Sequence, residues 1–188
     1  MEKLEFRRQV FHLGFGLVLV ALIHFGFIEP IWLFYLLGAG VLFSLLSLRY
    51  RLPFISWCLN TFDRKSALPG LGALTFLVGC ILALLLFPMG IALASILVLT
   101  VGDSVSVLVG QSFGRTRSPW NARFLEGTFA AVLLSSLAAS LFVPFWIAFI
   151  ASAASLILEA LELKIMGRRL DDNIWLPVVA GAVISILI

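Results

Sequence analysis

The amino-acid sequence predicts an all-α membrane protein, a polytopic bundle of about seven transmembrane helices with a cytoplasmic N-terminus. Three observations lead to this fold class. Hydrophobic residues make up 62% of the 188 residues and charged residues only 12%, whereas soluble domains carry about 25% charged residues. The mean hydropathy is +1.13. Apolar runs of membrane-spanning length recur along the whole chain, and the basic residues fall between them in a regular pattern.

Seven segments are apolar enough to be spans, each of which needs about 20 residues. The first follows the charged sequence MEKLEFRR, and no small-residue cleavage site comes after it, so we interpret it as a span and not as a signal peptide. The chain, residues 1–188, is then a single transmembrane domain with no room for a separate soluble module. The expected spans are residues 9–27, 31–48, 71–87, 89–110, 125–143, 145–163 and 174–188, the last being short.

The basic residues predict the orientation. With the N-terminus in the cytoplasm and seven spans threaded, all 13 Lys and Arg lie on the cytoplasmic side, and Glu29 is the single charge on the other. The net charge of +3 therefore reflects topology, and we expect no nucleic-acid partner. We expect an integral, multi-pass protein whose chemically capable loops all face the cytoplasm. The longest, residues 49–70, is typical of an interfacial segment on anionic headgroups or of a plain amphipathic linker, and Lys65 is its best functional candidate.

Asp103 lies about two turns inside the fourth span, in the sequence VGDSVSVLVGQSFGR. A carboxylate in a span costs about 2.5–3.5 kcal/mol on insertion scales and is a functional candidate by default. The threading places other polar residues at a similar depth on the same side: Arg8 and His12 on one helix face, Gly110, Gly114, Arg115, Glu126, Glu159, Asp171, Asp172 and Asn173.

Several of these residues have a purely structural interpretation as well. His12 fits a packed, hydrogen-bonded helix residue, and Glu159 fits an interfacial partner of nearby basic residues. Arg115 fits a topology signal, and Asp171 and Asp172 fit the cap of the last helix. Taken together, however, carboxylates, Arg, Lys and glycines in one cytoplasmic basin indicate phosphate chemistry. Carboxylates hold Mg²⁺, basic side chains bind phosphate oxygens, and glycines let backbone N–H groups approach.

The stretch GDSVSVLVGQSFGRTRSPWNARFLEGTFA, Gly102 to Ala130, resembles the nucleotide-binding signature of the CTP-dependent lipid-alcohol kinases. This is the family of dolichol or polyprenol kinase, phytol kinase and CTP-dependent diacylglycerol kinase. The N-terminal RR-x-x-x-H and the later LDDN-x-x-x-P are similar to the family too, so the resemblance covers nearly the whole chain in order. Two positions depart from the pattern. Arg123-Phe124 stands where the family commonly has Lys and then Ser or Thr, and Ser104 stands where a smaller residue is frequent.

The resemblance implies a transmembrane catalytic domain that transfers a phosphoryl group from CTP to the hydroxyl of a membrane lipid alcohol, with Mg²⁺ as cofactor. Asp103 would bind Mg²⁺ or accept the hydroxyl proton, and Glu126 and Asp172 would be further metal ligands or the alternative base. The acceptor (a polyprenol, a phytol-like alcohol or diacylglycerol) and the preference for CTP over ATP stay open. The implied nucleotide-binding residues are Lys65, Gly110, Gly114, Arg115, Arg123, Gly127, Thr128 and Asn173, and further candidates are Arg8, His12, Asp171 and Glu159.

Two other functions are compatible with the sequence. A phosphatidate cytidylyltransferase would use the same CTP, Mg²⁺ and interface to make a CDP-lipid, but it would release pyrophosphate, and its longer acidic signature is absent. A small transporter would place its polar site near the midplane, between repeats, whereas the charges here crowd one interface. Glycine pairs such as Gly14/Gly16 allow close contact between helices within one chain or between two, so an oligomer is compatible with the sequence.

Overall fold

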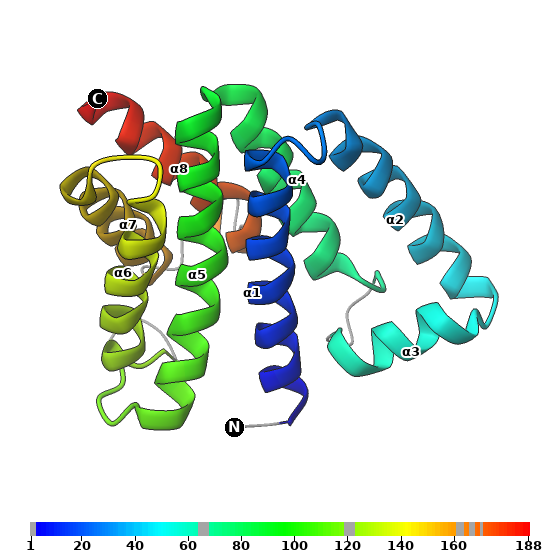
Figure 1. The fold of residues 1–188 in the computed structure, drawn as a ribbon. Coiled ribbons are helices and arrows are strands. Elements are labelled where there is room, and N and C mark those ends of the chain that lie inside the picture. The colour runs from blue at the N-terminus through cyan, green and yellow to red at the C-terminus, as the bar shows by residue number, and fades with distance from the viewer. Residues whose placement is uncertain (1–2, 64–67, 119–122, 161–163, 166–167, 170) are drawn as a thin grey trace.

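The computed structural model describes residues 3–63, 68–118, 123–160, 164–165, 168–169 and 171–188. Within these ranges the chain forms eight helices and one pair of two-residue strands (Figure 1). In chain order the elements are α1 (Lys3–His24), α2 (Ile31–Arg49), α3 (Pro53–Phe62), α4 (Leu71–Leu86), α5 (Met89–Phe113), α6 (Leu125–Ala139), α7 (Phe145–Ala160), β1 (Lys164–Ile165), β2 (Arg168–Arg169) and α8 (Asp172–Leu187).

The helical fold predicted from the sequence is confirmed, because each of the seven expected spans contains a helix. Three of them, α1, α2 and α5, are long and apolar enough to cross a membrane. The other four, α4, α6, α7 and α8, are apolar helices of 16, 15, 16 and 16 residues. At 1.5 Å per residue they are about 24 Å long, shorter than a hydrocarbon core of about 30 Å. Length and composition therefore support membrane association through at least three helices.

Helix α5 forms the centre of the bundle. Every residue from Ala92 to Ser106 is buried, and the helix packs against α1, α4, α6, α7 and α8 (Figure 1). This stretch is rich in Ala, Ser and Gly as well as Val and Leu, and such small residues allow neighbouring helices to approach closely. Asp103 therefore lies in the most enclosed part of the molecule.

Helices α2 and α3 lie at the periphery, with α2 packed on α4 and α3 (Figure 1). Most of the α2 surface is exposed apolar side chain, as expected for a helix that faces lipid. Helix α3 begins with Pro53 in its first turn, has no buried residue, and exposes Phe54 and Trp57. It occupies the segment that the sequence identified as interfacial or as an amphipathic linker, and its exposed aromatic side chains are compatible with both.

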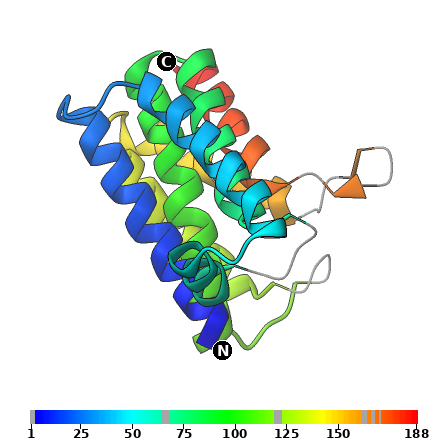
Figure 2. The same ribbon diagram turned by 90° about the vertical axis from the view of Figure 1, so that its right-hand side faces the viewer.

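The two ends of the chain lie at opposite ends of the bundle (Figures 1 and 2). The loop from α5 to α6 and the β1–β2 pair both project from the same side of the bundle, as Figure 2 shows. The pair is antiparallel, with Lys164 opposite Arg169, and it is the one sheet among the described residues.

Candidate functional site

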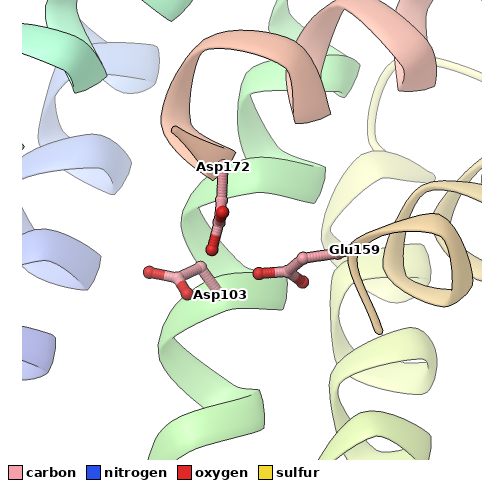
Figure 3. A group of neighbouring side chains, drawn as sticks. All are labelled: Asp103, Glu159 and Asp172. Atoms are coloured by element: carbon pink, nitrogen blue, oxygen red, sulfur yellow. The ribbon is translucent and has the colours of Figure 1, made fainter. Parts of the chain in front are cut away.

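Three carboxylates from three different helices converge inside the bundle (Figure 3). Asp103 comes from the middle of α5, Glu159 from the last turn of α7, and Asp172 is the first residue of α8. One oxygen from each lies within 4.8 Å of the other two. Asp103 and Glu159 are only 7% and 5% exposed. We call these three residues, with Arg123, the carboxylate cluster.

Arg123 supplies the positive charge of this cluster. Its Nη2 atom lies 3.2 Å from Asp172 Oδ2 and 3.5 Å from Asp103 Oδ1, and it forms an ion pair with Glu159. Its Nη1 atom donates a hydrogen bond of 2.8 Å to the hydroxyl of Ser106, one turn below Asp103 on α5. Burial lowers the pKa of Arg123, but the charges of Glu159, Asp103 and Asp172 outweigh burial and raise the pKa above its ordinary value. The guanidinium is therefore a permanent cation.

The loop between α5 and α6 is folded so that Arg123 points back into the bundle. The backbone N–H of Ser118 donates to the carbonyl of Arg123, and that of Leu125 donates to the carbonyl of Thr116. These bonds close the loop on itself around an antiparallel bridge between Arg117 and Phe124. Arg123 therefore lies one residue before the bridged residue Phe124 and two residues before the first residue of α6.

The start of α8 explains why three consecutive polar residues, Asp171, Asp172 and Asn173, follow one another. Asp171 caps the helix, because its Oδ1 accepts the backbone N–H of Asn173 at 3.1 Å. The Asp172 side chain belongs to the carboxylate cluster and points toward Asp103 and Glu159 (Figure 3). The Asn173 amide donates to the Gly72 carbonyl and to the Thr75 hydroxyl of α4, at 3.3 and 3.2 Å. The cap interpretation of Asp171 thus fits the structure, and Asn173, a nucleotide candidate, joins α8 to α4.

The glycines implied in nucleotide binding lie where helices and loop approach each other closely. A Cβ on Gly127 would stand 2.3 Å from the Ser106 carbonyl oxygen and 2.8 Å from Gly110 Cα. A Cβ on Gly114 would stand 2.3 Å from the Gly110 carbonyl oxygen and from the Phe124 ring. Protein atoms occupy the space beside both residues, so these glycines allow α6 and its preceding loop to pack on α5. Close packing accounts for them without a ligand.

The remaining loop candidates do not join the carboxylate cluster. Glu126 accepts the backbone N–H of Thr116 at 2.9 Å, and Thr128 donates to the Phe124 carbonyl at 3.4 Å. Arg115 is exposed. Lys65 lies outside the described residues. The structure therefore brings Asp103, Asp172 and Arg123 together as the sequence suggested, but Glu159 and not Glu126 supplies the third carboxylate.

His12 and Arg8 lie on α1. The His12 ring packs edge-on against Phe76 of α4, with ring centroids 4.6 Å apart. Arg8 pairs with Glu5 at 2.7 Å. Gly16, one turn after His12, packs against Thr100, one turn before Asp103. Because α1 and α5 run antiparallel and pack together (Figure 1), Asp103 lies on the turn of α5 next to the turn of α1 that carries His12.

A comparison with known proteins found one informative relative. The protein named "Uncharacterized protein MJ1137" of Methanocaldococcus jannaschii is 30% identical over 185 residues, which are 96% of this chain and 93% of that protein. The chain belongs to the family of this protein. The relationship covers the whole bundle, with all four residues of the carboxylate cluster inside the aligned length. No family model matches the chain, and no solved structure matches it.

Sequence reasoning named Glu159 only as a further candidate, without a stated role, and did not consider Gln9. Glu159 is an acidic residue at the end of an apolar run, a pattern that the interfacial interpretation explains equally well. A role for Ser106 could have been found from its spacing, because it lies three residues after Asp103 and so on the same helix face. Gln9 is four residues after Glu5 and three before His12, which places all three on one face of α1.

Proposed function

We propose that the protein is a CTP-dependent kinase that phosphorylates the hydroxyl of a membrane lipid alcohol at the cytoplasmic face of the membrane. The carboxylate cluster carries this proposal. Three acidic side chains from α5, α7 and α8 meet in a largely buried position, and the motif-bearing loop between α5 and α6 sends Arg123 into the same place.

The donor set of the cluster suits a divalent cation. Hard carboxylate oxygens are typical ligands of Mg²⁺ and Mn²⁺. Oxygens bound to one Mg²⁺ are about 3.0 Å apart when adjacent and about 4.2 Å apart when opposite, so separations of up to 4.8 Å require the three side chains to move inward around the ion. When all three acids are ionised, the cluster holds three negative charges and the one positive charge of Arg123. Its net charge is then −2, which one divalent cation would neutralise. Asp103, Glu159 and Asp172 would hold it, and bound Mg²⁺ would neutralise charge on the nucleotide phosphates.

The reaction places distinct demands on the residues of the chain. The alcohol oxygen forms a bond to the γ-phosphorus of CTP while the bond to the β–γ bridging oxygen breaks, and CDP leaves. The hydroxyl proton passes to a carboxylate, either Asp103 or Asp172. Arg123 is paired with the three carboxylates, and its guanidinium and the neighbouring Ser106 hydroxyl can bind phosphate oxygens beside them. A bundle that encloses Asp103 also keeps water away from the transferred group.

The assay uses purified protein in lipid vesicles with γ-labelled CTP or ATP and a panel of alcohols that includes farnesol and dioctanoylglycerol. We expect label in a lipid monophosphate, release of CDP, and no turnover after Mg²⁺ is chelated. Failure of both nucleotides to label any alcohol would refute the kinase. Pyrophosphate release with phosphatidic acid as acceptor would identify a cytidylyltransferase instead.

The proposal includes seven spans with the N-terminus in the cytoplasm. Support comes from the confinement of all 13 basic residues to one side of the threaded chain. In a variant with Cys58 and Cys80 replaced by Ser, the substitutions Glu29→Cys and Arg117→Cys place one thiol on each side. A membrane-impermeant maleimide added outside intact cells should label the first variant and not the second, and labelling of both or of the second alone contradicts this topology.

A further inference from the structure

Four polar residues of α1 form one continuous face of that helix: Glu5, Arg8, Gln9 and His12, which we call the α1 polar face. Their spacing of three, four and seven residues puts them on adjacent turns. Glu5 Oε1 accepts hydrogen bonds from Arg8 Nη2 at 2.7 Å and from Gln9 Nε2 at 3.0 Å. Gln9 has no exposed surface. This face is therefore an ordered feature, since its members bind each other.

Three atoms of the α1 polar face are buried without a hydrogen-bond partner among the described residues. They are Arg8 Nε, Gln9 Oε1 and His12 Nε2. Buried polar atoms in native proteins are nearly always satisfied by protein, by ordered water or by a ligand, so these three atoms indicate a bound molecule at the α1 polar face. The amide orientation of Gln9 is fixed because a carboxylate oxygen can only accept, which leaves Oε1 as the unpaired atom.

The chemistry of these three atoms selects the class of ligand. Arg8 Nε can only donate, Gln9 Oε1 can only accept, and the imidazole nitrogen of His12 can do either. A carboxylate or phosphate could not donate to Gln9, and an ammonium group could not accept from Arg8. A hydroxyl both donates and accepts, so a neutral hydroxyl-bearing group satisfies this set.

Aromatic rings connect the α1 polar face to the exposed side of α3. His12 contacts Phe76, and each ring in the series lies within 6.3 Å of the next between centroids. The two ends of the row differ in exposure, which is 2% at Phe76 and 71% at Phe54. This aromatic row consists of Phe76, Phe15, Phe11, Phe62, Trp57 and Phe54. It offers an apolar body a series of ring contacts from the surface of an amphipathic helix to the half-buried imidazole of His12.

We infer that the α1 polar face and the aromatic row bind the acceptor lipid, with the lipid hydroxyl on His12 Nε2 and the apolar chain along the rings. Gly16, one turn after His12, packs against Thr100, one turn before Asp103, so a hydroxyl held at His12 lies on the side of α1 that packs against α5. His12 is thus a residue that positions the acceptor. Phosphorylation of this hydroxyl rests on the proposed function, but binding of the hydroxyl does not.

The test compares His12→Phe, which keeps a ring against Phe76 and removes Nε2, with His12→Gln, which can return a polar atom to a similar place. His24 is the matched control, because it lies on the same helix and packs edge-on against Phe142 at the far end. A long-chain alcohol with a diazirine next to the hydroxyl is photo-crosslinked to each protein in vesicles. The site of attachment is mapped by mass spectrometry, and the corresponding methyl ether serves as the second probe.

We expect the alcohol to label α1 and α4 near His12 and Phe76, and the methyl ether to label them several-fold less. His12→Phe should reduce labelling about tenfold and raise KM for the alcohol about tenfold with KM for CTP unchanged, as for the loss of one buried hydrogen bond. His12→Gln should restore part of both values, and His24→Phe should change neither.

Labelling that is equal in wild type and His12→Phe, or that falls away from α1 and α4, overturns the inference. A rise in KM for CTP with KM for the alcohol unchanged also overturns it and assigns His12 to the nucleotide. If no alcohol is phosphorylated but labelling still depends on His12, the binding site stands and the kinase proposal fails. Size-exclusion elution and the thermal midpoint of each variant show that the fold is retained.

Discussion

The carboxylate cluster and the α1 polar face are two polar regions of one apolar bundle, and Asp103 lies near both. In the cluster, one guanidinium reaches all three carboxylates. On the α1 polar face, Glu5 holds its neighbours, and three buried atoms have no partner among the described residues. The cluster carries its own cation, so a divalent ion must compete with Arg123 for the carboxylates, and a phosphate must compete with the carboxylates for Arg123. The α1 polar face has three buried atoms that can still form hydrogen bonds, which suits a neutral ligand.

The largest effect is expected from Asp103→Asn, because Asp103 is a carboxylate of the cluster and lies on α5, the helix that packs against α1. The substitution keeps the shape and removes the charge, and loss of a metal ligand or a proton acceptor should reduce kcat by about 10²–10⁴-fold. CDP release with a saturating alcohol measures it. Glu29→Gln, which removes an exposed carboxylate at the far end of α1 and α2, should keep wild-type activity. Wild-type turnover by a correctly inserted Asp103→Asn protein contradicts the proposed mechanism.

Gly127→Ala should act on the cluster alone. The new Cβ would meet the Ser106 carbonyl oxygen at 2.3 Å, so α6 must move away from α5 and take Arg123 with it. Such overpacking costs about 3 kcal/mol and should lower the thermal midpoint in detergent by several degrees. Gly38→Ala is the matched control, since nothing lies within 4 Å of its added Cβ, and it should leave the midpoint unchanged or slightly higher. Equal midpoints for both variants would show that the α5–α6 contact tolerates separation.

Asp103 and Gly127 illustrate which features of the site could be predicted from the sequence. A charge inside an apolar run is visible in the sequence, so Asp103 was recognised, and hydropathy located the apolar helices. Gly127 is different, because the sequence shows a glycine beside a motif but not what stands against it. Phosphate approach and helix packing both require the missing side chain, and only the position of Ser106 in space distinguishes them. The place of Glu159 in the cluster was not predicted for a related reason. Sequence proximity favoured Glu126, whereas the packing of α7 beside α8 brings Glu159 to Asp172.

Arg123→Gln tests whether the guanidinium and a divalent cation compete. Removal of the positive charge leaves the three carboxylates without their present partner, so Mn²⁺ should bind the nucleotide-free protein about tenfold more tightly. KM for CTP should rise, because a phosphate contact is lost. Electron paramagnetic resonance of Mn²⁺ titrations measures the first effect without turnover. Arg117→Gln, in the same loop but stacked 5.8 Å from the centroid of Phe124, should change Mn²⁺ affinity little. Weaker Mn²⁺ binding by Arg123→Gln would mean that Arg123 organises the carboxylates and does not compete with the metal.

The smallest effect concerns the link between the two regions. Asn173 follows Asp172 on α8 and donates to Thr75, which precedes Phe76 of the aromatic row. Asn173→Ala removes this bond and the one to Gly72, and should reduce the free energy of unfolding by about 1 kcal/mol. If the link also aligns the two regions, kcat should fall about threefold while both KM values stay within twofold, because each region keeps its own contacts. Asn60→Ala, at an exposed position of α3, should change none of these values. A selective rise in KM for CTP would instead show that Asn173 contacts the nucleotide, as the sequence motif first suggested.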